Sequence, residues 1–219
     1  MTAARARPVI TFATDFGPAA PAVCRGVMYQ IAPEALIIDI SHQIPRFSIR
    51  DGAATLTFAL PYMPVGVHVA VVDPGVGTDR LAVALQVARG DVLVGPDNGL
   101  LMPAADRLGG VVRAHVLENS KLMLPIVTSS FHGRDIFAPM AAHLAMGTPI
   151  ETVGRAVDPA TLVRSKIPRP RIGEGGRVPL GSSLLMEDSE GQVSLADNQG
   201  NAAERLHLAV DRSVRIRPA

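Results

Sequence analysis

Two short segments of the sequence place charged side chains and glycines between hydrophobic runs. The first contains Asp73 and Arg80, and the second, farther along the chain, contains His132. Residues 67–72, just before Asp73, have the apolar composition of a buried parallel strand. Open α/β sheets bind ligands beyond the carboxyl ends of their strands, so we expect Asp73 to stand at the edge of a crevice.

A carboxylate, a guanidinium and an imidazole in one crevice can activate a water molecule. A neutral imidazole, with a pKa near ~6.5, can orient water, but water with a pKa of ~15.7 is too weak an acid to yield hydroxide unaided. A guanidinium would stabilise hydroxide character, and a carboxylate on the second imidazole nitrogen would hold its tautomer. Equally, Asp73 and Arg80 can form a salt bridge that fastens a loop, with His132 at the start of a helix. Spacing alone leaves both interpretations open.

Three further residues are candidates for binding a ligand. Asp15 follows the first predicted strand, and a carboxylate there can accept two hydrogen bonds from a vicinal diol such as a ribose. It can also cap the following segment. Phe47 suits either an aromatic platform or the core. Asn98 lies in Pro96-Asp97-Asn98-Gly99, which reads first as a turn and second as a ligand-facing edge.

Metal and phosphate sites have little support in the sequence. Gly75, Gly77 and Thr78 resemble a fragment of a phosphate loop, but no Gly-Lys-Ser/Thr follows them. A single cysteine cannot build a zinc site. No metal-ligand spacing joins the other histidines, which are His42, His68, His115, His143 and His207. We therefore expect no metal.

Alternating strand-like and helix-like segments predict an α/β fold for residues 1–166, with three layers and a mostly parallel central sheet. The expected strands are residues 9–14, 36–40, 67–72, 81–87, 92–94 and 111–117. The expected helices are residues 23–31, 48–60 with Ser48 as N-cap, and 134–146 with Gly147 as C-cap.

Composition changes after this domain. Residues 167–176 are rich in proline and glycine and read as a linker. Residues 177–219 contain short strands and a helical stretch over 201–208, too little to hold a large core alone. We expect a small, shortened, β-rich C-terminal domain.

Charge and hydropathy exclude two classes of partner. The 21 Lys+Arg and 20 Asp+Glu residues give a net charge of +1 without a long basic stripe, so we expect no nucleic-acid binding. No apolar segment approaches the ~20 residues that a membrane span needs, and the first residues lack a signal-peptide core. The lone Cys24 fits a reducing compartment. We expect a cytoplasmic protein.

Taken in order, the motifs resemble the adenosine-forming S-adenosyl-L-methionine (SAM) hydrolases, or SAM hydroxide adenosyltransferases, which are related to the SAM-dependent fluorinase and chlorinase. The resemblance rests on Thr14-Asp15-Phe16-Gly17, Asp39-Ile40-Ser41-His42, Val72-Asp73-Pro74-Gly75-Val76-Gly77-Thr78, Pro96-Asp97-Asn98-Gly99 and Phe131-His132-Gly133-Arg134-Asp135. It implies that Asp73, Arg80 and His132 activate water, a set that the halogenating relatives lack.

The same resemblance implies the rest of the site and the reaction. Asp15 matches the ribose-binding carboxylate, and Phe47 matches an aromatic residue against the substrate. Hydroxide would attack the 5′ carbon of SAM and release adenosine and methionine, with no metal or organic cofactor. Relatives form homotrimers whose active sites lie between subunits, which implies the same assembly here.

The C-terminal part resembles the family less completely. Residues 188–191 and 196–203 are similar to a final motif that contacts the methionine carboxylate and adenine, with Ser189 and Asn198 as the matching positions. A middle segment with an Asp-x-Phe-Gly-Asn motif has no counterpart between residues 177 and 184. The shortened domain leaves open a protein that binds adenosine or SAM without turnover. A separate alternative is a metal-dependent hydrolase that uses His42, His68 or His132 with Asp15, although the spacing of these residues disfavours it.

Overall fold

A computed structural model describes residues 7–165, 183–187, 193–197 and 202–208. The chain divides into two units, Met1–Ile167 and Pro168–Ala219, which are described separately. The predicted linker, residues 167–176, lies outside the described residues.

The first unit is built on a mixed sheet of six strands in the order β2-β1-β3-β5-β4-β6. Its strands are β1 (Val9–Thr14), β2 (Leu36–Ser41), β3 (Val67–Val71), β4 (Ala82–Val87), β5 (Val92–Pro96) and β6 (Val111–Val116). The pairs β1–β2, β1–β3 and β3–β5 are parallel, whereas β4 runs antiparallel to both β5 and β6. The expected strands are present, but the β4–β5 hairpin gives the sheet an antiparallel side.

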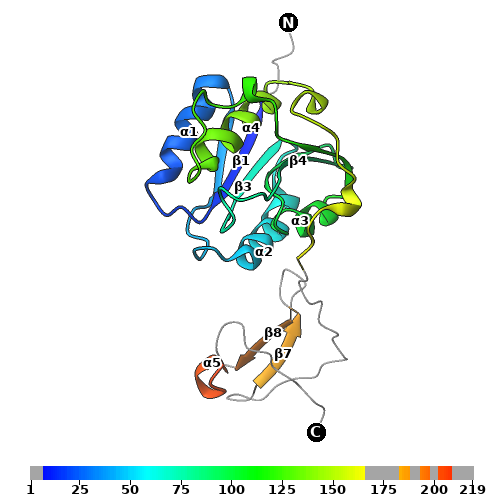
Figure 1. Cartoon of the computed structure of the whole chain (residues 1–219). Helices are drawn as coiled ribbons and strands as arrows, with labels where there is room; N and C mark the ends of the chain where they lie inside the picture. Colours follow the sequence, from blue (N-terminus) through cyan, green and yellow to red (C-terminus); the bar gives the residue numbers. More distant parts are fainter. Residues whose placement is uncertain (1–6, 166–182, 188–192, 198–201, 209–219) are drawn as a thin grey trace, which may run out of the picture. The chain divides into compact units, whose positions relative to one another are not determined.

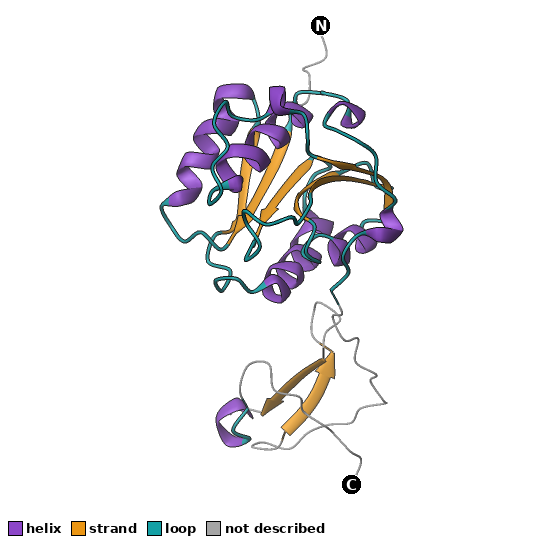
Figure 2. Cartoon of the chain, viewed as in Figure 1, coloured by secondary structure: helices purple, strands orange, loops and turns teal. Residues whose placement is uncertain are grey.

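Helices cover both faces of this sheet (Figures 1 and 2). One face packs against α1 (Ala20–Ile31) and α4 (Ala138–Ala145), and the other packs against α2 (Ile49–Ala59) and α3 (Met102–Arg107). The division follows the two-residue period of a strand, because Phe12 joins the core under α1 and α4 while Ala13 joins the opposite core.

Local signals explain where the helices begin and end. The Ser48 side chain accepts a hydrogen bond from the Asp51 N–H, which makes it the expected N-cap of α2. Gly147 follows α4 with a φ of +94°, a conformation that glycine adopts without strain. The expected single helix over residues 134–146 is wrong in part, because a π-helical turn, η3 (Gly133–Phe137), precedes α4. Helix α3 was not expected, since six residues are too few for a periodic pattern.

Short helical turns complete the first unit: η1 (Leu60–Tyr62), η2 (Ser120–Leu122), η4 (Ile150–Thr152) and η5 (Pro159–Thr161). The second unit contains an antiparallel pair, β7 (Ser183–Glu187) and β8 (Val193–Asp197), and the short helix α5 (Ala202–Arg205). Among the described residues, no helix combines the length and hydropathy of a membrane-spanning segment.

Candidate active site

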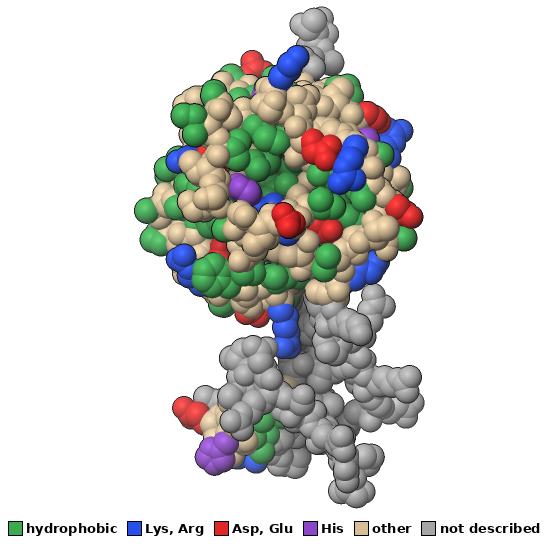
Figure 3. Space-filling model, viewed as in Figure 1, with side chains coloured by type: hydrophobic (Ala, Val, Ile, Leu, Met, Phe, Trp, Pro, Cys, Tyr) green, Lys and Arg blue, Asp and Glu red, His purple; other side chains and the backbone are tan. Residues whose placement is uncertain are grey.

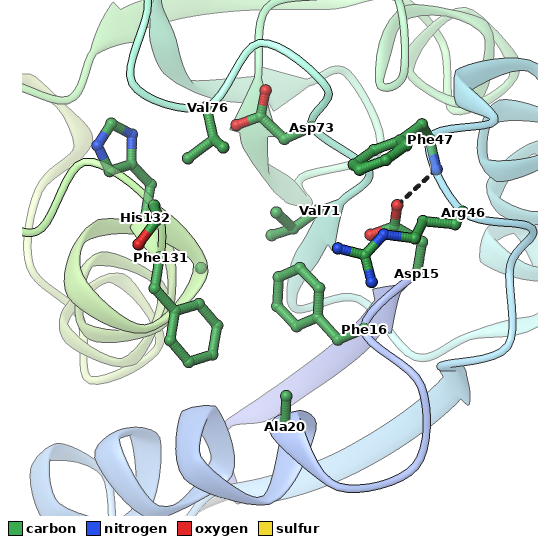
Figure 4. Close-up of a pocket in the computed structure, with 12 residues that line it drawn as sticks. Asp15, Phe16, Ala20, Arg46, Phe47, Val71, Asp73, Val76, Phe131 and His132 are labelled. Atoms are coloured by element: carbon green, nitrogen blue, oxygen red, sulfur yellow. Dashed lines mark hydrogen bonds between the residues drawn. The ribbon is translucent and has the colours of Figure 1, made fainter.

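A pocket of about 390 Å³ opens at the carboxyl ends of β1 and β3. The chain leaves β1 through α1 to reach β2 on one side, then returns through α2 to β3 on the other side. This reversal is the topological switch point at which open α/β sheets bind ligands. The lining residues are Asp15, Phe16, Ala20, Arg46, Phe47, Val71, Asp73, Val76, Ser130, Phe131, His132 and Gly133 (Figure 4). Hydrophobic side chains gather near the centre of the visible face of the first unit, with charged groups around them (Figure 3).

Arg80 joins the other two members of the predicted trio. Its Nε lies 3.1 Å from Asp73 Oδ1 and 2.8 Å from Oδ2, and its Nη2 lies 2.5 Å from Oδ2. The same Nη2 lies 2.8 Å from His132 Nδ1. The salt bridge and the approach of the imidazole therefore coexist, so the two interpretations of the sequence are not exclusive.

The order of contacts differs from the expected one. A carboxylate was expected on the imidazole, but the guanidinium lies between Asp73 and His132. Arginine carries five N–H donors and no acceptor, so His132 Nδ1 must accept this hydrogen bond. A neutral His132 therefore carries its proton on Nε2.

The protonation state of His132 follows from its surroundings. Burial and then the positive charge of Arg80 lower the pKa of His132 below its ordinary value of 6.5, against the opposite effect of Asp73. The imidazole is therefore neutral at neutral pH. Figure 4 places His132 and Asp73 on the same side of the pocket, with Val76 drawn between them.

The turn η3 aims His132 at the pocket. His132 directly precedes η3, and a Cβ on Gly133 would lie 2.6 Å from the Phe16 ring, so this position needs glycine. The buried Asp135 accepts hydrogen bonds from the Thr128 N–H at 2.8 Å and from its hydroxyl at 2.6 Å. These bonds fasten the loop that leads to His132. Isolated π-turns of this kind are frequent at functional sites.

Asp15 and Phe47 meet on the other side of the pocket. Asp15 Oδ2 accepts a hydrogen bond from the Phe47 N–H at 2.8 Å (Figure 4). Phe47 has a φ of +64° and is 54% exposed, so its ring is not part of the core. The carboxylate thus holds the loop before α2, and among the described residues no group donates a hydrogen bond to its other oxygen, Oδ1.

Among the pocket residues that were not sequence candidates, three bring a guanidinium or an aromatic ring: Arg46, Phe16 and Phe131. The Arg46 guanidinium lies 4.9 Å from the centre of the Phe47 ring and projects into the pocket (Figure 4). Phe16 and Phe131 meet edge to face at 5.5 Å. A signal existed for each, since Arg46 adjoins Phe47 and both phenylalanines adjoin a candidate polar residue.

Asn98 lies outside the pocket lining. Its side-chain amide donates to the Val72 carbonyl at 2.9 Å and accepts from the Leu100 N–H at 3.1 Å, which braces the chain just before Asp73. A substrate contact by Asn98 stays a prediction. The two other predicted contacts, Ser189 and Asn198, lie outside the described residues.

The histidines considered as metal ligands are separated. His42 and His68 each bond to a threonine and an aspartate and do not line the pocket with His132. Within the described ranges, no group of three His, Cys, Asp or Glu side chains is arranged to hold a metal ion.

Comparisons with known proteins agree with this geometry. A family model described as the SAM hydroxide adenosyltransferase N-terminal domain matches residues 10–154. The chain is 46% identical to an (R)-S-adenosyl-L-methionine hydrolase of Salinispora tropica, over 96% of this chain and 80% of that protein. It is 29% identical to a fluorinase of an Actinoplanes species, over 79% of this chain and 66% of that protein. A solved structure of an uncharacterized conserved protein from Thermotoga maritima superposes with a TM-score of 0.79 and 30% identity, covering 91% of this chain and 96% of that one.

Proposed function

Because the chain belongs to the SAM hydroxide adenosyltransferase family, we propose that its pocket binds SAM and that the protein hydrolyses SAM to adenosine and L-methionine. One observation of the site supports this proposal: Arg80 donates hydrogen bonds to both oxygens of the Asp73 carboxylate, and its Nη2 lies 2.8 Å from His132 Nδ1. Both Asp73 and His132 line the pocket, so a water molecule there can meet both.

The reaction needs a positioned nucleophile more than an acid. The water oxygen bonds to the 5′ carbon as the carbon–sulfur bond breaks, and the electron pair of that bond passes to sulfur. The sulfonium leaves as a neutral thioether, so the leaving group needs no proton. In-line placement of the water supplies much of the catalysis.

The contacts of Arg80 divide the work between the other two groups. His132 donates its Nε2–H to the water oxygen and orients a lone pair toward the 5′ carbon. Asp73 Oδ1 carries one long hydrogen bond from Arg80 and has acceptor capacity left for the water proton. Arg80 stays charged and stabilises the negative charge that develops on the oxygen. This assigns the proton to Asp73 rather than to His132.

The ribose lies against Asp15 in this proposal. Phe47 N–H occupies Oδ2, so Oδ1 accepts from the vicinal hydroxyls. The exposed Phe47 ring supplies an apolar surface beside the ribose. With the sugar held there, its 5′ carbon extends toward Asp73 and His132.

Product analysis tests the activity. Purified protein is incubated with SAM in the presence of a strong chelator, and adenosine and methionine are separated by chromatography. We expect both products in equal amounts, with the rate unchanged by the chelator, and little product from a His132→Ala variant. Absence of product above that variant excludes the proposed hydrolysis, and loss of product with chelator favours a metal-dependent reaction.

We also propose a cytoplasmic homotrimer with active sites shared between subunits, in which Ser189 and Asn198 contact the methionine carboxylate and adenine. The support is the resemblance of residues 188–191 and 196–203 to the family's final motif. A complementation experiment tests the shared site. Asp73→Ala and Asn198→Ala variants, each inactive alone, are unfolded, mixed and refolded together, and part of the SAM hydrolase activity should return if each site uses two subunits. No regain, or a monomer by sedimentation, contradicts the shared site.

A further inference from the structure

Two side-chain networks of the same composition branch from strand β1. In the first, Thr14 Oγ1 lies 2.9 Å from His42 Nδ1, His42 Nε2 lies 3.0 Å from Asp39 Oδ1, and Arg25 pairs with Asp39 Oδ2. In the second, the same bonds join Thr11, His68, Asp91 and Arg89, at 2.9 Å for Thr–His and 2.8 Å for His–Asp. The two networks are chemically alike and lie at opposite ends of the sheet.

Among the hydrogen bonds of the described residues, those of the first network reach the loop that carries Asp15, and those of the second network do not. Thr14 Oγ1 also accepts a hydrogen bond from the Phe16 N–H at 3.2 Å. The His42 carbonyl accepts one from the Gly17 N–H at 2.9 Å. His42 therefore holds the loop on both sides of Asp15, through its side chain and through its main chain.

His42 Nε2 has two neighbours in the first network, Asp39 Oδ1 at 3.0 Å and Arg25 Nη1 at 3.4 Å. Burial of Asp39 opposes its charge, but hydrogen bonds from His42 and then Arg25 hold the pKa of that carboxyl below its ordinary value. The shorter contact favours a bond from His42 Nε2–H to Asp39, and with the proton on Nε2 the Nδ1 accepts from the Thr14 hydroxyl. The lone pairs of that hydroxyl then remain for the Phe16 N–H. The Phe12 ring, 4.8 Å from the His42 ring, restricts the imidazole further.

The second network ties the amino-terminal end of the sheet. Asp91 is fully buried and accepts from the Gly66 N–H at 3.2 Å, while Arg89 donates to the carbonyls of Leu60 and Pro61. None of its residues lines the pocket. It therefore provides a built-in comparison for a network that acts on stability alone.

We propose that His42, held by Asp39, is a positioning residue that sets the Asp15 carboxylate for the ribose diol. The inference rests on the proposed function and names one more determinant of ribose recognition. The contacts run from the half-exposed Asp39 through His42 to the Thr14 side chain, just before Asp15, and to the backbone N–H groups of Phe16 and Gly17, just after it.

The first experiment removes the far end of this chain. Asp39 is 41% exposed, so Asp39→Ala should fold. Asp106 is 44% exposed and pairs with Arg164, which makes Asp106→Ala the matched control. We expect Asp39→Ala to raise the KM for SAM several-fold with a smaller effect on kcat, and Asp106→Ala to leave both unchanged. Equal kinetics for the two variants overturn the proposal.

The second experiment compares Thr14→Val with Thr11→Val, which remove the same hydroxyl from the two networks. Calorimetry measures the affinity of each for adenosine and for 2′-deoxyadenosine. We expect Thr14→Val to lose about tenfold of its preference for adenosine, Thr14→Ser to keep the preference, and Thr11→Val to lower only the melting temperature. A preference retained by Thr14→Val, or lost equally by Thr11→Val, overturns the proposal.

An Asp15→Asn variant separates this inference from the function it rests on. If Asp15→Asn loses the preference for adenosine while Thr14→Val and Asp39→Ala retain it, the network role is wrong and the ribose contact stands. If Asp15→Asn retains the preference, the ribose contact is wrong, and the positioning role of His42 fails with it. If wild-type protein binds adenosine with the expected preference but does not turn over SAM, the positioning proposal stands and the hydrolysis does not.

Discussion

At the scale of single residues, the decisive contact is the one between Arg80 and His132 Nδ1. It determines the tautomer of His132, and it places the positive charge of Arg80 next to the imidazole, which lowers the pKa of His132. A histidine whose Nδ1 is occupied in this way cannot also be a base through Nε2 without losing its hydrogen bond to Arg80. The trio therefore differs from a hydrolase triad, in which a carboxylate contacts the imidazole.

We predict that Arg80→Lys lowers kcat for SAM by roughly 10²–10³-fold, because a lysine cannot contact both Asp73 oxygens and His132 in one plane. Initial rates at saturating SAM measure this effect. Arg155→Lys is the control, since Arg155 also pairs with a carboxylate but is 57% exposed and far along the chain from the trio. A kcat within twofold of wild type for Arg80→Lys would contradict the assigned role.

The pH dependence of the reaction should follow the protonation of His132. Its pKa lies below 6.5, and protonation would remove the acceptor that Arg80 uses and place two positive groups together. We expect kcat/KM to be flat from neutral pH down to about 6.5 and to decline only below it. The same shift makes the folded state lose stability in acid, since the unfolded chain takes up this proton first. A pH–rate profile that declines with a midpoint above 6.5 argues against the assignment.

At the scale of elements, the site is assembled from loops at the ends of β1 and β3 and from the turn η3. The π-turn inserts an extra residue into the start of a helix, and this brings His132 toward Arg80 while Asp135 fastens the preceding loop. The glycine at the start of the turn lies against Phe16, a residue of the β1 loop. Pocket shape and histidine position are therefore coupled through one close contact.

We predict that Gly133→Ala lowers activity by at least tenfold, because its Cβ would lie 2.6 Å from the Phe16 ring and must displace either Phe16 or His132. Gly26→Ala in α1 is the control, since no atom lies within 4 Å of its Cβ and alanine favours helix by roughly 0.5–1 kcal/mol. Assays at a temperature well below unfolding separate activity from stability. Full activity in Gly133→Ala would show that the contact relaxes without cost to the site.

At the scale of the whole first unit, the buried network of Thr11, His68, Asp91 and Arg89 joins β1, β3, the start of β5 and the turn η1. Burial opposes the charge of Asp91, but hydrogen bonds from His68 and then Arg89 outweigh it and hold the pKa of Asp91 well below its usual range. A buried charge with this many partners is costly to leave incomplete.

We predict that Asp91→Ala lowers the free energy of unfolding by about 3–5 kcal/mol, because His68 and Arg89 lose their shared acceptor. In wild-type protein, the contribution of Asp91 is fully present above its unfolded pKa near ~3.9 and is lost as the pH falls below it. Urea unfolding at pH 7 and at a pH about two units below that unfolded pKa measures both effects. An Asp91→Ala variant as stable as wild type at pH 7 contradicts the prediction. The KM for SAM at pH 7 should be the same for the variant and the wild type.

Sequence patterns were sufficient for the strands, the capping of α2 and the placing of Asp15 and Asp73 at strand ends beside a pocket. The grouping of Arg80 and His132 with Asp73 came from the family resemblance, because spacing alone left it open. Strand periodicity, turn residues and polar residues at strand ends are local properties of the sequence, so they can be read without knowing how the helices and the sheet pack together. The antiparallel side of the sheet was not predicted because the apolar pattern of a strand does not record its direction; the short turn over residues 88–91, which joins β4 to β5, was the local signal for it.

Tertiary structure alone decided how the trio is connected. The sequence determined which charged groups are present and which follow a strand, since those are properties of neighbours along the chain. It could not determine that Arg80 lies between Asp73 and His132, that Arg46 and Phe131 enter the pocket, or that two similar threonine networks serve opposite ends of β1. Hydrogen bonds have a reach of about 3 Å, so their partners are chosen only when packing has brought distant segments to that distance.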